Sequence, residues 1–455
     1  MYNGEERNRG GPVPPEGMSV MDQQTRSIFD FLDAGVSPWH AAAESVRRLE
    51  AAGYVRLEET ERWQIAPGGR YYVTRNGSAV AAFRVPEGAV EGWRIALSHS
   101  DAPTWRIKNS GIEQAPSGCV KLETEGYGGM LMGTWLDRPL GVAGRAVVRT
   151  KEGLSSRTVH LDRDLLVIPS VAIHFDRGVN EGRRWDPQTD LQPLWGQIGC
   201  PPLEDLIAAE LGVAREDLMT WDLELVTRQK ATLIGPEGEF FLSPRIDDLE
   251  CAGTTLEGFL QAGSTPDGTL VLWGMLDNEE VGSSSRQGAE GTFLMDTLER
   301  LLHALGQGRE DLRRCAANGL VLSADNGHAV HPDHPEKSDP QNGPKLNGGV
   351  VVKINASQKY TTDAVSAALF GEICRRAGVP IQRFANRADM PGGSTLGNLQ
   401  GHSLSSPMLD IGLAQLAMHS AVETAGTADI GHMIRAVRAF CETPFQCVGD
   451  GQYRI

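Results

Sequence analysis

Histidine and carboxylate side chains stand at points of the sequence where buried strands are expected to end. His99 follows the apolar run at 94–97, the pair Glu279–Glu280 follows the run at 270–276, and Asp325 follows the run at 320–322. In open α/β sheets, ligands bind at the edge formed by the carboxyl ends of the strands. We therefore expect these polar clusters to meet at one edge of one sheet.

These residue types suit a catalytic zinc site. Zinc binds imidazole nitrogen and carboxylate oxygen, and two zinc ions about 4 Å apart need a bridging carboxylate and further terminal ligands. Such a set is available at predicted strand ends and turns if Asp247 bridges: His99, Asp247, Glu280, Asp325 and His419. Glu279 would then stay free to act as general base on the attacking water.

The same residues also have an ordinary structural interpretation. A glutamate pair in a loop, such as Glu279–Glu280, is usually just solvated. A single histidine, such as His419, is more often a buried residue with satisfied ring nitrogens. Residue types and spacing alone therefore leave the metal site as one of two interpretations.

The elements around these residues predict an α/β domain that is interrupted by a β-rich insert. Helical spacing begins after Ser37 and ends at Gly53, and alternating stretches separated by Gly and Pro turns fill about 102–235. Other elements are predicted as strands at 71–73, 79–83, 94–97, 270–276 and 320–322, and as helices at 202–211, through Leu298, and at 364–377. We therefore divide the chain into a flexible tail at 1–18, a discontinuous catalytic domain at 19–101 and 236–455, and the insert at 102–235.

Composition excludes several classes of protein. Across 455 residues, 43 Lys and Arg face 59 Asp and Glu, a net charge of −16 that disfavours nucleic-acid partners. No apolar run approaches the roughly 20 residues that cross a bilayer, and the first residues lack the apolar core of a secretory signal. The seven cysteines form no CxxC pair, which is typical of a reducing compartment. We expect a cytoplasmic protein without membrane partners.

Long motifs along the chain resemble the M18 family of aminopeptidases, in particular the aspartyl aminopeptidase group. The resemblance extends from about residue 27 to 440. Its motifs include LSHSDAP (97–103), TWLDRPLGVAGR (134–145), IPSVAIHFDRGVNE (168–181), RIDDLECAGTTLEGF (245–259), DNEEVGSSSRQGA (277–289), SADNGHAVHPDHPEK (323–337), KINASQKYTTDAV (353–365) and LAMHSAVETAG (416–426).

This resemblance implies a mixed-sheet zinc-peptidase domain with an inserted dimerisation domain, assembled as a tetrahedral dodecamer. It implies two zinc ions per subunit, for which Co²⁺ or Mn²⁺ could substitute. By the same resemblance, His99 and Asp325 hold one ion, Glu280 and His419 hold the other, and Asp247 bridges them. Glu279 is implied as the general base, and Asp101 as the carboxylate that orients the His99 ring.

The resemblance also implies residues that contact substrate. His174 would reach into a neighbouring subunit's site and stabilise the oxyanion, while His328, Lys353 and Tyr360 would contact the peptide. Lys353 ends an apolar stretch and needs an anionic partner, which is either a substrate carboxylate or a structural Asp. The implied activity is removal of N-terminal residues, preferentially Asp or Glu, from peptides.

Two positions depart from the family pattern, and two other functions remain open. Asp248 stands where the family usually has Asn, next to a peptide bond expected to be cis, and Asn326–Gly327 stands where Met–Ala is usual. One alternative is a co-catalytic zinc N-acyl amidohydrolase or carboxypeptidase on the same framework. The other is an inactive assembly or cargo shell, which would be expected to lack a ligand or the base.

Overall fold

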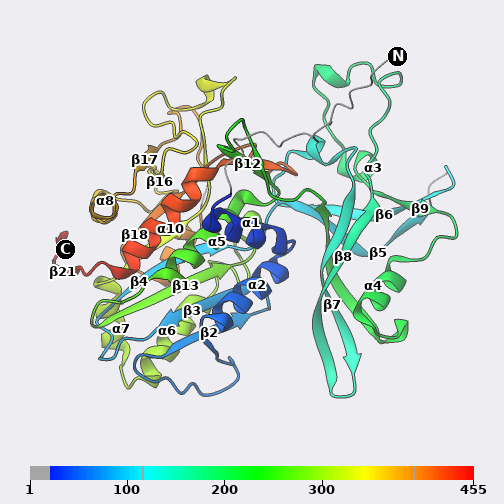
Figure 1. The fold of residues 1–455 in the computed structure, drawn as a ribbon. Helices are drawn as coiled ribbons and strands as arrows, with labels where there is room; N and C mark the ends of the chain where they lie inside the picture. Colours follow the sequence, from blue (N-terminus) through cyan, green and yellow to red (C-terminus); the bar gives the residue numbers. More distant parts are fainter. Residues whose placement is uncertain (1–20, 115–116, 394) are drawn as a thin grey trace, which may run out of the picture.

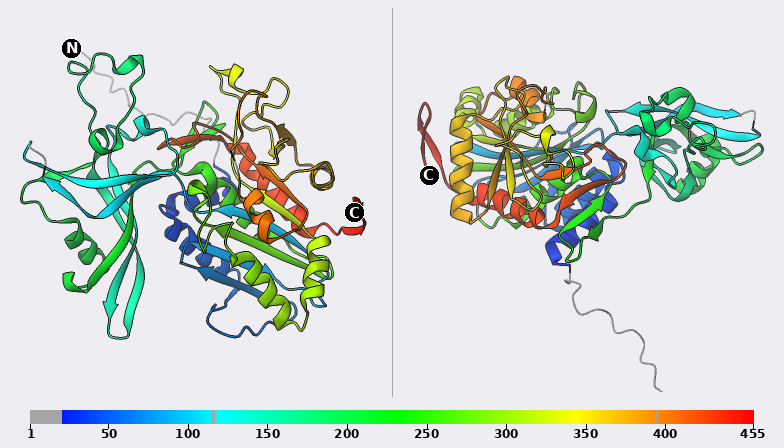
Figure 2. Two further views of the ribbon diagram at one scale, coloured as in Figure 1. Left: turned by 180° about the vertical axis from the view of Figure 1, so that it is seen from behind. Right: turned by 90° about the horizontal axis from the view of Figure 1, so that it is seen from above.

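The structure of the chain is a computed structural model that describes residues 21–114, 117–393 and 395–455. The predicted tail at 1–18 lies outside the described residues. Two sheet-based bodies stand side by side, a larger one with helices on both faces and a smaller one built from long antiparallel strands (Figures 1 and 2). No helix in the described part of the chain is long and apolar enough to cross a membrane.

The larger body is built on a mixed nine-stranded sheet. Its strands, in spatial order, are β1 (Val55–Arg56), β2 (Arg70–Arg75), β3 (Ala79–Arg84), β13 (Thr269–Leu276), β4 (Gly92–His99), β14 (Leu320–Ala324), β18 (Met408–Gly412), β16 (Val350–Lys353) and β17 (Ile381–Phe384). The four central strands β13, β4, β14 and β18 run parallel. Their carboxyl ends therefore share one edge, as the sequence predicts.

Helices cover both faces of this sheet (Figure 1). One hydrophobic core packs α1 (Gln23–Ala34), α2 (Pro38–Ala51), α5 (Ile246–Gln261), α8 (Ala364–Ala377) and α10 (Thr427–Glu442) on one face. The second core packs α6 (Phe293–Ala304), α7 (Arg309–Ala317) and α9 (Leu396–Ser403) on the other. Strand β3 shows why: Val80 and Ala82 enter the first core, while Ala81 and Phe83 enter the second, because successive side chains point to opposite faces.

The smaller body is an antiparallel six-stranded sheet with its own core. Its strands, in spatial order, are β8 (Gly153–Leu166), β7 (Leu140–Thr150), β10 (Leu218–Thr227), β5 (Thr104–Gln114), β6 (Cys119–Tyr127) and β9 (Leu194–Gln197). Helix α4 (Leu203–Leu211) contributes Ile207 to this core beside Trp105 and Val148. All of these elements fall within the range predicted for the insert, whose boundaries and role in dimerisation stay predictions.

A third, five-stranded sheet lies beside the carboxyl edge of the central strands. Its strands are β11 (Thr232–Ile234), β12 (Phe240–Ser243), β20 (Glu423–Gly426), β19 (Ala414–Leu416) and β15 (Gly327–His328). The remaining elements are α3 (Pro187–Asp190), the hairpin β21 (Gln446–Gly449) and β22 (Gln452–Arg454), and 3₁₀ turns at Met132–Trp135, Val179–Glu181, Arg215–Asp217, Glu279–Val281 and Pro335–Lys337. The predicted helices and strands all have counterparts, within a few residues at their ends.

Candidate metal centre

The predicted site residues come together at the carboxyl edge of the nine-stranded sheet. His99 is the last residue of β4, Asp325 directly follows β14, and Glu279–Glu280 begin the 3₁₀ turn after β13. Asp247 lies in the first turn of α5, and His419 lies in the tight turn between β19 and β20. One pocket of about 400 Å³ is lined by every predicted site residue except Asp101 and His174.

The residues that flank this edge adopt unusual backbone conformations. Arg245, Asn278 and His419 have positive φ angles of 57°, 62° and 65°, in the left-handed region that side chains with a Cβ rarely adopt. The Asp247–Asp248 peptide bond is cis, which matches the expectation drawn from the family. Positive φ angles at residues with a Cβ persist only where the surrounding structure holds them in place, and they gather at functional sites.

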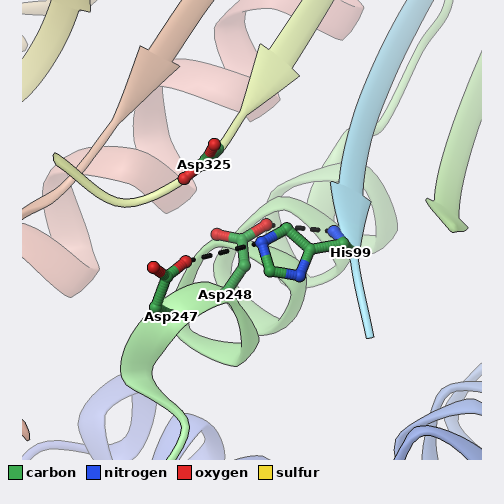
Figure 3. Close-up of side chains that lie close together, drawn as sticks. All are labelled: His99, Asp247, Asp248 and Asp325. Carbon is green, nitrogen blue, oxygen red and sulfur yellow. Dashed lines mark hydrogen bonds and ion pairs between the residues drawn. The ribbon is translucent and has the colours of Figure 1, made fainter. Parts of the chain in front are cut away.

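Asp247 lies between two histidines and faces each with a different oxygen. Its Oδ1 is 3.4 Å from Nε2 of His99, and its Oδ2 is 3.3 Å from Nε2 of His419. The His419 Nε2 is also 3.3 Å from Oε1 of Glu280. Ligand atoms within 4.8 Å of one another form three overlapping groups: His99 with Asp247, Asp248 and Asp325; His99 with Glu279 and Glu280; and Asp247 with Glu280 and His419. Asp247 thus belongs to two neighbouring clusters, of which Figure 3 shows the one with His99, Asp248 and Asp325.

Buried oxygens without donors show that these residues fit a divalent cation. Asp247 Oδ1, Asp248 Oδ1 and Glu280 Oε1 are buried and accept no hydrogen bond from the described residues. Buried carboxylate oxygens are costly unless a donor or a cation satisfies them. A site of imidazole and carboxylate ligands is also the donor set that zinc prefers.

The pKa values of the clustered side chains also indicate an excess of carboxylates at the site. Burial raises the pKa of Glu279 to about 8 and that of Glu280 to about 7, with nearby carboxylates adding to both shifts. Burial opposes protonation of His419, but the negative charges of Asp247 and Glu280, each 3.3 Å from its Nε2, outweigh burial and raise the His419 pKa to about 11. Protons are therefore held where a metal ion would replace them, because metal ligands must give up their protons.

Three further buried carboxylates hold the backbone of these residues in place. Glu423 accepts hydrogen bonds from the backbone N–H of Asp247 at 3.0 Å and of His419 at 2.6 Å. Asp101 accepts from the N–H of Glu279 and of Glu280, both at 3.1 Å. Asp248 accepts from the N–H of His99 at 3.0 Å. The backbone that carries the cluster is thus fixed by charge-assisted hydrogen bonds.

Two of the supporting residues were not predicted from the sequence. Glu423 stands four residues after His419, and its burial on the short strand β20 is the signal that marks it. Tyr127, from β6 of the six-stranded sheet, donates its hydroxyl hydrogen to Asp101 Oδ2 at 2.7 Å and accepts from Asn278 Nδ2 at 2.9 Å. The smaller body therefore takes part in building this edge of the larger one.

Asp101 contacts the His99 ring mainly through its backbone. The His99 Nδ1 is 3.0 Å from the Asp101 carbonyl oxygen and 3.5 Å from Oδ1 of the carboxylate. A second partner on the far ring nitrogen fixes the orientation of a metal-binding histidine. The carboxylate of Asp101 chiefly accepts hydrogen bonds from the Glu279–Glu280 turn.

The Lys353 ammonium already has partners within the chain. Its Nζ donates to the Asn326 carbonyl oxygen at 2.8 Å and lies 3.3 Å from Oδ1 of Asp325. The structural Asp that the sequence left open as one partner is therefore present. The Nζ also lies 5.6 Å from the ring centroid of Tyr360, and both side chains line the pocket.

An aromatic wall closes one side of the pocket. Phe384, which was not predicted as a site residue, packs edge-on against the His328 ring at 6.2 Å and against the Tyr360 ring at 6.1 Å, measured between centroids. All three line the pocket together with Lys353. The predicted substrate residues His328, Lys353 and Tyr360 thus form one continuous surface.

His174 lies away from this pocket. It is an exposed residue in the loop between β8 and the 3₁₀ turn at Val179–Glu181, on the smaller body. Its neighbours Ile173 and Phe175 are 47% and 88% exposed, unusual values for large apolar side chains. Within one chain, the structure therefore brings His174 to no other predicted site residue.

An α/β fold with a histidine and carboxylate cluster at the carboxyl edge of its sheet is the arrangement that a metal-dependent hydrolase would use. The family model described as aminopeptidase I zinc metalloprotease (M18) matches residues 31–441. The chain belongs to this family, and the assignment made from its motifs is confirmed. It is a metalloaminopeptidase with the mixed α/β fold of zinc peptidases.

Individual relatives are similar to this protein over most of its chain. It is 40% identical over 424 residues to a probable M18 family aminopeptidase 2 of Clostridium acetobutylicum, covering 91% of this chain and 98% of that protein. A solved structure of a complex of Ape4 and Nbr1 matches with a TM-score of 0.89 and 32% identity, over 92% of this chain and 85% of that one. The mApe1 dodecamer of S. cerevisiae matches with a TM-score of 0.81 and 26% identity, over 92% and 96%.

Proposed function

We propose that the chain is a dizinc aminopeptidase that removes N-terminal residues, preferentially Asp or Glu, from peptides. The observation that carries this proposal is the position of Asp247, whose two carboxylate oxygens face the Nε2 atoms of His99 and His419. A carboxylate with one oxygen for each of two ligand groups is what a bridged pair of ions requires. His99 and Asp325 would complete one position, and Glu280 and His419 the other.

Two bound zinc ions would supply Lewis-acid chemistry, polarising the scissile carbonyl and providing a nucleophile from water at neutral pH. Glu279 would take the proton of the attacking water and return it to the leaving amine. This role is supported by the position of Glu279, which lines the pocket beside the cluster and donates its backbone N–H to Asp101. Asp101 would hold the backbone of Glu279 and Glu280 in place, and Glu423 would hold that of Asp247 and His419.

The preference for acidic residues is assigned to Lys353. At a net charge of −16 the protein repels acidic peptides at long range, so a local cation must select them. The Lys353 ammonium contacts the Asp325 carboxylate and the Asn326 carbonyl oxygen, and Lys353 lines the pocket beside Tyr360. A further charge-assisted hydrogen bond to a substrate carboxylate would use its remaining donor capacity.

The oxyanion would be stabilised by His174 from a neighbouring subunit of a tetrahedral homododecamer. One structural relative is a dodecamer, and His174 lies outside its own chain's pocket. Exposed Ile173 and Phe175 beside it form the apolar surface that an interface covers. We also keep the cytoplasm as the predicted location of the enzyme.

Hydrolysis of aminoacyl chromogenic substrates tests this function. The enzyme is stripped with a chelator, reloaded with Zn²⁺, Co²⁺ or Mn²⁺, and assayed with Asp, Glu, Leu and Ala substrates and their N-acetylated counterparts. We expect metal-dependent activity, faster on Asp and Glu, and none on the acetylated substrates. Hydrolysis of acetylated substrates would instead support the amidohydrolase alternative, and inactivity with every metal would support the inactive shell.

A further inference from the structure

Asp248 is a buried carboxylate at the metal cluster to which the proposed mechanism gives no chemical role. It follows Asp247 in the first turn of α5, and its side chain is fully buried. One oxygen, Oδ2, accepts the hydrogen bond from the His99 backbone N–H at 3.0 Å. The other, Oδ1, is buried and accepts no hydrogen bond from any residue that the structure describes.

The unpaired oxygen points into the cluster. Figure 3 shows Asp248 with one oxygen turned toward the His99 backbone and the other toward the space between Asp247 and Asp325. His99, Asp247, Asp248 and Asp325 each offer a ligand atom within 4.8 Å of the others. Asp248 therefore belongs to the same group of candidate ligands as the three residues assigned to that ion.

Nearby donors are already engaged elsewhere. The Cys251 thiol, one turn along α5, donates to the Asn326 side-chain oxygen at 3.1 Å. The Asn326 amide in turn donates to Oε2 of Glu250 at 2.8 Å. A buried carboxylate oxygen left without these donors is costly, and either a proton or a cation offsets its desolvation.

The charge of the cluster supports the same conclusion. Lys353 lies 3.3 Å from Asp325 and offsets one negative charge on that side of the site. On the other side of the cluster, Glu280 faces His419 at 3.3 Å. Asp248 adds a carboxylate to the side of the cluster on which Lys353 pairs with Asp325.

We infer that Asp248 is an additional ligand of the divalent ion that His99 and Asp325 hold, an inference that rests on the metal site of the proposed function. The position would then have one imidazole and three carboxylates. Such an oxygen-rich set suits harder ions such as Mn²⁺ in addition to Zn²⁺. Asp248 would thus be a determinant of which metal occupies this position.

Asp248→Asn tests the inference, because it keeps one oxygen for the His99 N–H and removes the second anionic oxygen. Affinities for Mn²⁺ and Zn²⁺ are measured by competition with a chromogenic chelator on the full chain. We expect one of the two ions to bind more weakly by more than the roughly 10- to 100-fold that loss of a residue orienting the ligands costs, with the larger loss for Mn²⁺. Glu250→Gln, another fully buried acid of α5, is the matched control and should leave both affinities unchanged.

Coordination is then compared directly between the Co²⁺-loaded wild type and the Co²⁺-loaded Asp248→Asn variant. X-ray absorption should give an average nitrogen and oxygen ligand number that falls in Asp248→Asn. Unchanged affinities, or an equal loss for Mn²⁺ and Zn²⁺ with an unchanged ligand number, would overturn the role of Asp248 as a ligand. Failure of the wild type to bind two ions would instead overturn the proposed dizinc site itself.

Discussion

The metal pocket and the loop of His174 are organised in opposite ways. In the pocket, buried carboxylates hold the backbone of each polar turn, as Glu423 does for Asp247 and His419. In the loop, His174 and Phe175 are exposed, and the pocket lies elsewhere. The candidate metal ligands of the pocket all come from one chain, whereas the proposed role of the loop needs a second chain. Variants on the two sides should therefore fail in different ways.

The largest effect is expected for Glu279→Gln. Gln keeps the shape of the side chain but cannot accept a proton, so kcat should fall on the order of 10²–10⁴-fold. The two metal ions should remain, because Glu279 is assigned as base and not as ligand. Kinetics and elemental analysis of the purified variant decide this, and a variant that is fully active or has lost metal would contradict the assignment.

His174→Phe should also abolish most activity, but by removing a group from a neighbouring site. Loss of one oxyanion donor typically costs about 10²–10³-fold in kcat. Metal content should be unchanged, and mixed oligomers with Glu279→Gln subunits should regain activity, because some sites then have both groups. Phe175→Ser tests the subunit contact separately from the oxyanion role of His174, since it should weaken assembly while leaving His174 in place. No recovery in verified mixed oligomers would mean that His174 does not act across an interface.

Glu423→Gln should act on metal binding more than on chemistry. The variant replaces a charge-assisted acceptor for the N–H of Asp247 and His419 with a weaker neutral one. Residues that orient metal ligands typically contribute 10- to 100-fold in affinity, and excess metal should restore much of kcat. Chelator competition and activity at saturating Zn²⁺ measure both. A loss of kcat that persists with full metal content would give Glu423 a different role.

Lys353→Met tests whether Lys353 selects acidic substrates. Loss of one charged hydrogen bond is worth about 1.5–3 kcal/mol, or about tenfold to a hundredfold in kcat/KM. The loss should fall on Asp and Glu substrates and spare Leu and Ala. Because Lys353 also pairs with Asp325, metal content must be measured alongside. An equal loss on all substrates with full metal content would remove the acidic preference and leave the aminopeptidase assignment standing.

The sequence predicted which polar residues lie together better than it predicted what supports them. His99, Glu280 and Asp325 follow buried parallel strands, and this pattern alone places them at one edge of the sheet. Glu423 and Tyr127 could not be found in this way, because their roles depend on hydrogen bonds to backbone groups far away in the sequence. The partner of Lys353 was left open for the same reason, since only the packing of β16 against β18 brings it to Asp325.

The smallest expected effect concerns the contact between the two bodies. His40 on α2 and His160 on β8 pack edge to face, with ring centroids 5.7 Å apart. Burial lowers the pKa of each to about 4, helped by the positive charge of Arg245 beside both and of Arg228 and Lys230 beside His160. His160 also lies 3.7 Å from Asp162, and His40 Nδ1 lies 2.7 Å from the Ser37 hydroxyl.

The folded protein thus binds fewer protons here than the unfolded chain, whose histidines titrate near 6.5. The contribution of this pair to the free energy of unfolding is therefore present above pH 6.5 and is lost as the pH falls toward 4. His160→Gln cannot be protonated in this range, so its Tm should fall less than that of the wild type between pH 7.5 and 5.5, by roughly a few degrees. Calorimetry on both proteins at equal metal occupancy measures this difference. Parallel Tm curves would mean that protonation of the pair is not what couples the smaller body to the metal-binding one.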